Sequence, residues 1–207
     1  MNKTGVIYGI NGPVVYLKGN TGFKMSEMVY VGKERLVGEV IALTKDTTTV
    51  QVFEETTGLK PGETVTASGD ALSVTLGPGI LNNIFDGIER PLSEIAKQSG
   101  KYISRGLTVD SLDTEKKWDV HVTVSEGEEL MGGAIIAATQ DTRSIVHKSM
   151  VPPDVNGTVI WAAKDGKYTI LDPIVKLKLE DGTEKEITLA QKWPIRIPRP
   201  THKRFPA

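Results

Sequence analysis

The sequence predicts a mainly β protein: a small N-terminal β-barrel, a short helical connector and a second β-rich domain. Short apolar runs separated by turn dipeptides fill the first 75 residues. The apolar spacing changes to a helical one near residue 80, and alternating apolar and polar residues return after residue 110. We therefore expect a barrel over 1–75, a connector over 76–109, a second β domain over 110–185, and a strand with a Pro-rich linker over 186–207.

The barrel prediction depends on short runs with turn signals between them. The apolar runs are 6–8, 14–17, 28–31, 36–43, 49–53 and 65–74. Asn11-Gly12 predicts a hairpin between the first two runs, because both residue types tolerate positive φ. Pro61-Gly62 is a typical turn pair. Five or six short strands at this spacing favour a small closed or nearly closed barrel.

One helix is expected in the connector. Its apolar residues recur at helical spacing and are Ile80, Leu81, Ile84, Phe85 and Ile88. Gly77-Pro78-Gly79 precedes this stripe as an entry, and Pro91 ends or kinks the pattern. Leu92, Ile95 and Ala96 can add another turn or two.

The second β domain is predicted from strand-like alternation between residues 118 and 124. Further strands are expected at 134–138, 144–151, 157–162, 168–171 and 174–179. Asn156-Gly157, Asp165-Gly166 and Asp181-Gly182 can each supply the positive φ of a tight hairpin. The apolar strand 186–190 is expected to lack a partner, and the prolines after it favour extended chain.

Composition excludes several classes of protein. With 25 basic and 26 acidic residues the net charge is −1, which argues against a whole-chain polyanion binder. There is no cysteine, hence no disulfide, thiolate metal site or cysteine nucleophile. The first residues hold no secretory signal and no apolar run is long enough to span a membrane. We expect a soluble, cytoplasmic chain.

Residues that could carry chemistry are few. His121, His147 and His202 do not have metal-ligand spacing, so we expect no metal site. Two groups of carboxylates are expected to be solvated in polar turns rather than to form an acid–base pair. They are Glu54 with Glu55, and Glu126 with Glu128 and Glu129. The basic tail of Arg196, Arg199, Lys203 and Arg204 is a weak footprint for nucleic acid and favours a linker or docking strand.

Phosphate-binding loops are also not recognisable. A P-loop reads G-x-x-x-x-G-K-[ST], in which the hydroxyl binds Mg²⁺. Gly-Lys occurs at Gly32, Gly100 and Gly166, and the residues after the lysines are Glu34, Tyr102 and Tyr168. None supplies a hydroxyl of the required type. We therefore expect no catalytic and no cofactor-binding residue in this chain.

A carrier protein is one alternative. The segment around Lys148, with Asn156-Gly157 after it, resembles a biotinyl or lipoyl carrier, in which a flattened β-barrel presents a modified lysine in a hairpin. Residues 145–151 lack the Met-Lys-Met or Asp-Lys-Ala context of such carriers and indicate a continuous strand. A stand-alone β binding module is the second alternative.

Several longer motifs resemble the catalytic A subunit of V-type and A-type rotary ATPases. They are FEETTGL from residue 53, PGETV from 61, LGPGIL from 76, IFDGIERPL from 84, VPP from 151, GTV from 157, QKWP from 191 and RP from 199. They occur in the family's order along essentially the whole chain. The insertion at 110–185 distinguishes these catalytic chains from the B subunits and from the F-type α and β subunits.

The resemblance implies a mechanical role. The barrel is expected in the crown of an alternating A3B3 hexamer beside B subunits, and the inserted bulge domain, a barrel-sandwich hybrid, is expected to reach the peripheral stalk. In the family the Trp-Pro and Arg-Pro segment leads into the domain that binds Mg-ATP. No position here matches that domain's catalytic residues. We expect the N-terminal, non-catalytic part of the catalytic chain, in a cytoplasmic complex held at a membrane without inserting into it, and without nucleic acid.

Overall fold

The protein is described here by a computed structural model that covers residues 3–19, 21–81, 83–100 and 102–200. The chain divides into two compact units. Of the described residues, the barrel unit takes those up to Val74, Phe85–Val109 and Pro194–Arg196. The sandwich unit takes Thr75–Ile84, Asp110–Trp193 and those from Ile197 onward.

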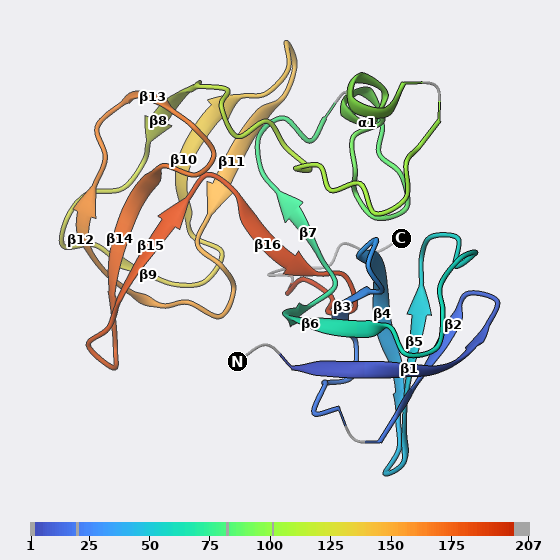
Figure 1. Ribbon diagram of the computed structural model, residues 1–207. Coiled ribbons are helices and arrows are strands. Elements are labelled where there is room, and N and C mark those ends of the chain that lie inside the picture. The colour runs from blue at the N-terminus through green and yellow to red at the C-terminus, as the bar shows by residue number, and fades with distance from the viewer. Residues whose placement is uncertain (1–2, 20, 82, 101, 201–207) are drawn as a thin grey trace, which may run out of the picture. The chain divides into compact units, whose positions relative to one another are not determined.

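The barrel unit contains a closed barrel of antiparallel strands, as predicted (Figure 1). The strands are β1 (Thr4–Asn11), β2 (Val14–Lys18), β3 (Glu27–Val31), β4 (Leu36–Leu43), β5 (Thr47–Val52) and β6 (Thr64–Ala71), in the order β1-β2-β5-β4-β3-β6. Alternate residues point inward and fill the barrel. The buried set includes Ile7, Val15, Leu17, Val29, Val31, Leu36, Val40, Val50, Val52 and Val65. Closure leaves these strands without an unpaired edge.

Two turns explain how the barrel strands connect. The β1–β2 loop is Gly12-Pro13, one residue later than the predicted Asn11-Gly12, because Asn11 is still paired with Val14. Gly12 has a φ of 56°, and a positive φ at the first of two loop residues is the pattern of a type II′ hairpin. At Pro61-Gly62 the amide of Glu63 donates to the carbonyl of Lys60, and Gly62 has a φ of 93°. This confirms the predicted turn there.

The helix predicted at 80–88 is wrong, whereas the helical turns expected at Leu92, Ile95 and Ala96 are confirmed. Helix α1 spans Leu92–Ser99, whereas the described residues of 80–88 are not helical and Ile84 is 73% exposed. Asp86 forms a turn instead, since its Oδ1 accepts hydrogen bonds from the amides of Ile88 and Arg90. Pro91 is extended and precedes the first helical residue, where a missing amide hydrogen costs nothing.

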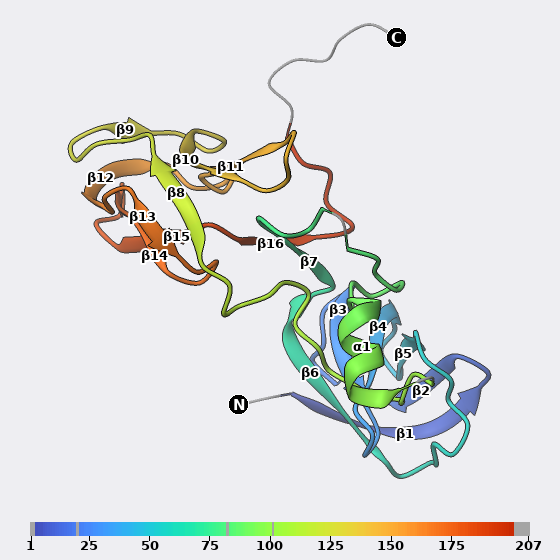
Figure 2. The ribbon, with the colours of Figure 1, turned by 90° about the horizontal axis from the view of Figure 1, so that it is seen from above.

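The sandwich unit consists of two four-stranded sheets with a common apolar core (Figure 2). The first sheet, ordered β11-β10-β8-β13, contains β8 (Trp118–Val122), β10 (Ile135–Gln140), β11 (Val146–Met150) and β13 (Gly166–Tyr168). The second, ordered β15-β14-β12-β9, contains β9 (Glu129–Leu130), β12 (Gly157–Ala162), β14 (Pro173–Leu179) and β15 (Glu184–Thr188). Their shared core includes Trp118, Val120, Ile136, Val159, Ile170, Ile174, Leu177 and Ile187.

For this unit one expected hairpin is confirmed and three expectations need correction. The confirmed one is Asp181-Gly182, which joins the β14–β15 hairpin and in which Gly182 has a φ of 81°. The other two dipeptides join strands of different sheets, so neither closes a hairpin. Gly157 is required for another reason: a Cβ there would lie 2.5 Å from the carbonyl oxygen of Lys178. The strand expected at 168–171 lies at Gly166–Tyr168, because β13 pairs with β8 in this register.

The strand expected at 186–190 does not lack a partner. Its first part lies in β15, which pairs with β14 and buries Ile187. Two further strands, β7 (Ser73–Leu76) and β16 (Gln191–Pro194), form a two-stranded sheet. Within the described ranges, no helix is long and apolar enough to cross a membrane.

Candidate functional site

A polar cluster of described residues lies in the barrel unit and is centred on Arg90. Its Nε donates to Asp86 Oδ2 at 2.7 Å, and its Nη1 donates to the carbonyl of Leu107 at 3.0 Å. The same Nη1 lies 3.6 Å from Glu54 Oε2, which also accepts the amide of Gly106 at 3.0 Å. Arg90 therefore ties three separate stretches of chain together.

The electrostatics of this cluster favour the ionised form of Asp86. Burial raises the pKa of Asp86, but hydrogen bonds from the Arg90 amide and guanidinium and from the Ile88 amide outweigh it and hold this pKa below 3.8. Glu54 was expected to be solvated, and this is wrong: its side chain is 9% exposed because the 105–107 segment covers it. The side chains of Asp86, Arg90 and Glu54 all contact other protein groups, although Glu54 Oε1 is buried without a hydrogen-bond partner. The cluster therefore serves as a structural lock.

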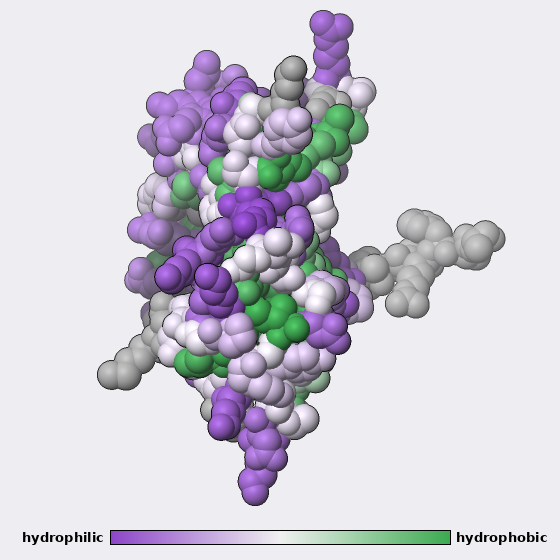
Figure 3. Space-filling view, turned by 45° about the vertical axis from the view of Figure 1, so that its right-hand side comes forward, coloured by the Kyte–Doolittle hydropathy of each residue, from purple (hydrophilic) through white to green (hydrophobic). Residues whose placement is uncertain are grey.

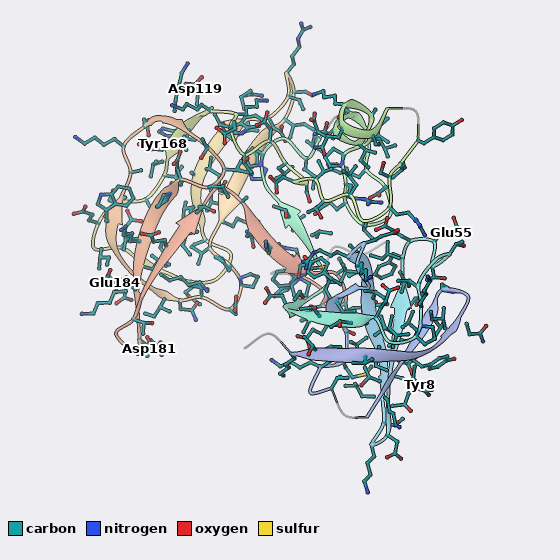
Figure 4. All side chains as sticks on the ribbon, viewed as in Figure 1. Tyr8, Glu55, Asp119, Tyr168, Asp181 and Glu184 are labelled. Atoms are coloured by element: carbon teal, nitrogen blue, oxygen red, sulfur yellow. The ribbon has the colours of Figure 1, made fainter. Side chains whose placement is uncertain are left out.

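A second contact extends this lock. Arg105 donates to the carbonyl of Thr57 and lies 3.2 Å from Glu34 Oε1. Beside it, Gly106 approaches the backbone of Glu34 so closely that a Cβ would lie 1.8 Å from its carbonyl oxygen. Glu55, labelled in Figure 4, remains exposed and accepts a hydrogen bond from the hydroxyl of Thr57.

In the sandwich unit His121 and Asp165 form a hydrogen-bonded pair. Nδ1 of His121 lies 2.7 Å from Asp165 Oδ2, and Asp165 Oδ1 accepts the amide of Val122 at 2.8 Å. The hydrogen bonds from His121 and Val122 lower the pKa of Asp165. The pair borders a groove of about 540 Å³ that Asp119, Ala138, Gln140 and Val146 also line. Both side chains are mostly exposed, and among the described residues no three metal-ligating side chains come together.

Strand β11 carries the two other residues singled out from the sequence. Lys148 is paired with Ala138 in mid-strand, so it does not lie at a hairpin tip. His147, next to it, is half-buried, and burial lowers its pKa although the charge of Asp141 opposes this. The geometry of Lys148 is that of a strand residue rather than of a carrier lysine.

The remaining candidates are used in internal contacts, are exposed, or lie outside the described residues. Arg196 donates to Glu39 in the barrel unit. Arg199 donates to Gln191 Oε1 at 3.3 Å and lies 4.7 Å above the ring of Trp193. Glu128 accepts the amide of Ser125, and Glu126 and Glu129 are exposed. His202, Lys203 and Arg204 lie outside the described residues.

The three Gly-Lys pairs occupy unrelated settings. Gly32 lies in the turn between β3 and β4, Gly100 ends α1, and Gly166 begins β13. A P-loop instead follows a strand and leads into a helix, so that backbone amides can surround the phosphates. None of these pairs has that arrangement.

Exposed apolar side chains occur in both units. They include Tyr8 in the barrel unit and Met131, Val146 and Leu171 in the sandwich unit. On the face in Figure 3 apolar residues form small patches among polar ones. Tyr8, labelled in Figure 4, lies 6.2 Å from the ring of Tyr16 on the outside of the barrel. Amphipathic aromatic side chains of this kind are enriched in protein interfaces.

Comparison with known proteins gives the same two-part organisation. Residues 7–69 match the profile of the "ATP synthase alpha/beta family, beta-barrel domain". Residues 109–196 match that of the "ATPsynthase alpha/beta subunit barrel-sandwich domain". These two matches give no support to the carrier hypothesis.

Individual relatives are similar along nearly the whole chain. The V-type ATP synthase alpha chain of Halothermothrix orenii is 48% identical over 206 residues, which is 100% of this chain and 35% of the relative. The A-type ATP synthase A subunit of Methanopyrus kandleri is 50% identical over 201 residues, or 97% of this chain and 34% of the relative. That of Pyrococcus abyssi is 44% identical over 206 residues, or 100% of this chain and 20% of the relative. The chain thus spans about a third or less of the relatives' length, and it belongs to the ATP synthase alpha/beta family, of which it contains the β-barrel and barrel-sandwich domains.

Proposed function

We propose that this chain is the non-catalytic scaffold of the A subunit of a V-type or A-type rotary ATPase. In this proposal the barrel joins B subunits in an A3B3 ring, and ATP hydrolysis or synthesis takes place in a part of the full-length protein that these residues do not match. The observation that carries the proposal is the pairing of a closed barrel with a barrel-sandwich domain in the family's order. The proposed location is cytoplasmic, in a complex held at a membrane.

The physical argument for the barrel is stiffness. A closed barrel keeps all its strand edges paired, so it can serve as a fixed collar while attached domains open and close. The lock around Arg90 supports this, because it joins the 85–109 segment to the barrel through buried charged groups. The barrel and the 85–109 segment would then respond as one rigid body to movement of the attached domains.

The barrel-sandwich domain is proposed to contact the peripheral stalk. It has its own buried core and projects polar hairpins, such as the one that carries Asp181 and Glu184 in Figure 4. A domain with an independent core can bear load without drawing on the stability of the barrel. Nucleic acid and direct membrane insertion have no part in this proposal.

Nucleotide titration tests the catalytic half of the proposal. The full-length protein is proposed to hold Mg-ATP in another part, so isothermal titration of this chain with Mg-ATP should give no binding in the micromolar range. A micromolar dissociation constant would overturn the claim that nucleotide chemistry lies elsewhere.

Assembly with B subunits tests the structural half. Native mass spectrometry of this chain mixed with the B subunit of the same complex should detect a heteromeric species. Replacing Tyr8 with Glu places a charge on the outer barrel face and should weaken that species. Glu184→Lys, on the sandwich unit, is the control and should leave it unchanged. Absence of any complex at tens of micromolar would contradict the proposed ring contact.

A further inference from the structure

A short segment late in the chain lies against the barrel. Pro194–Arg196 belongs to the barrel unit, while the residues before and after it belong to the sandwich unit. The amide of Ile195 donates to the carbonyl of Leu72 at 3.0 Å. Arg196 donates from Nε to Glu39 Oε1 at 2.9 Å and from Nη2 to Oε2 at 2.6 Å. Two parallel hydrogen bonds of this kind fix both distance and orientation.

The position of Glu39 explains why this contact matters. On β4 the side chains of Leu36 and Val40 fill the barrel. Since side chains along a strand alternate between its two faces, Glu39, next to Val40, points outward. An outward carboxylate would ordinarily be solvated, yet this one is 1% exposed. Its charge is compensated by the guanidinium of Arg196.

The two partners differ in exposure. The Arg196 side chain is 59% exposed, against 1% for that of Glu39. If lifting of the segment also hydrates Glu39, neither charge is left buried without a partner. If Arg196 alone is neutralised while the segment stays in place, a buried carboxylate is left unpaired, which is strongly unfavourable. Where opening hydrates Glu39, the contact can open locally without unfolding the barrel.

We propose that Pro194–Arg196 is a releasable strap and that the Arg196–Glu39 pair is its latch. The closed latch attaches to the barrel a stretch of chain that arrives from the sandwich unit and returns to it. Opening it frees that stretch while the strands of the barrel stay paired. The pair would thus set whether Pro194–Arg196 stays attached to the barrel.

Because Glu39 is buried and Arg196 is largely exposed, three variants of the 207-residue chain should behave differently. Arg196→Gln leaves Glu39 buried and unpaired, so the strap should open. Glu39→Gln removes the buried charge and leaves an arginine that is already largely hydrated. It should therefore open the strap less than Arg196→Gln does. The double variant replaces the ion pair with a neutral pair and should close the strap again. Glu27→Gln, at a buried glutamate of β3 that accepts the Lys24 amide, is the matched control.

Amide hydrogen exchange measured by NMR is the test, with the Ile195 amide as reporter and the β4–β5 amides as the measure of barrel integrity. We expect exchange at Ile195 to be roughly tenfold faster in Arg196→Gln, with the double variant and Glu27→Gln within about threefold of the unmodified chain. Unchanged exchange in Arg196→Gln would overturn the latch. Equal acceleration across β4 and β5 would also overturn it, because the pair would then support the whole barrel.

Trypsin provides a second measurement that keeps Arg196 in place. The enzyme cleaves after arginine, and a closed strap should protect the Arg196–Ile197 bond. Cleavage there should be faster in Glu39→Gln than in Glu27→Gln, while cleavage after Lys164 in the sandwich unit should be equal in both. Equal rates after Arg196 would count against the proposal even if one variant proved too unstable for NMR.

Discussion

The guanidinium of Arg90 lies 3.6 Å from the carboxylate of Glu54, and the two side chains are 10% and 9% exposed. Glu54 follows the last strand residue of β5, whereas Arg90 lies in the segment that leads into α1. Their contact buries charge on both sides, so each group depends on the other for its compensation. The 85–109 part of the expected connector is thereby part of the barrel unit, whereas Thr75–Ile84 belongs to the sandwich unit.

Replacing Arg90 with Met should destabilise the barrel unit by about 3 kcal/mol, because Glu54 and Asp86 would both lose a buried cationic partner. Lys97→Met removes an exposed partner of Glu94 and should cost less than about 1 kcal/mol. Urea denaturation followed by far-ultraviolet circular dichroism measures both. Equal losses in the two variants would contradict the structural role of Arg90.

Gly106→Ala should destabilise the same unit for a steric reason. Gly106 has a φ of 66°, and a Cβ would lie 1.8 Å from the Glu34 carbonyl oxygen, so the segment would have to move. Gly62→Ala is the matched control: its φ is 93°, but nothing lies within 4 Å of its Cβ position. We expect a loss of roughly 1–3 kcal/mol at Gly62 from backbone strain and about 2 kcal/mol more at Gly106. Similar losses in the same denaturation assay would show that the close approach is unimportant.

The strands were predictable because their signals are local. Alternation within a run determines which face is buried, and pairs such as Pro61-Gly62 and Asp181-Gly182 meet the φ requirements of their own turns. Both β modules follow from such patterns. A local pattern also gave a wrong prediction. The apolar spacing of 80–88 is typical of a helix, but Asp86 accepts hydrogen bonds from the amides of Ile88 and Arg90 and forms a turn instead.

The side-chain clusters could not be predicted, since they join residues that are distant in sequence. Glu54 follows a strand in a polar stretch, and its burial depends on Gly106, 52 residues later. Glu39 and Arg196 are separated by 157 residues. A charged residue in an alternating strand is read as solvated unless the segment that covers it is known. The structure supplies that segment.

Acid should weaken the barrel unit through Asp86. Hydrogen bonds hold its pKa below 3.8 in the folded state, so the unfolded chain takes up its proton first as the pH falls. The contribution of Asp86 to stability is therefore complete above about pH 5 and is lost as the pH falls through the folded-state pKa. Unfolding free energies of the unmodified chain and of Asp86→Asn should converge between about pH 5 and pH 3. A difference that stays constant over this range would refute the assignment.

The sandwich unit should respond separately to changes in its own core, and the three tryptophans allow this to be observed. Trp118, Trp161 and Trp193 all lie in the sandwich unit, so tryptophan fluorescence reports on it and not on the barrel. Ile174 is fully buried on β14, whereas Leu171, three residues earlier, is 62% exposed. These two residues form a matched pair for truncation.

Ile174→Ala removes methyl groups from a packed core and should lower the stability reported by fluorescence by about 2–5 kcal/mol. Leu171→Ala should change it by less than about 0.5 kcal/mol, because that side chain is already in contact with water. Leu17→Ala, in the barrel core, should shift the transition seen by circular dichroism while leaving the fluorescence transition in place. If Leu17→Ala moves both transitions equally, the two cores unfold as one cooperative body and the sandwich unit is not independently stable.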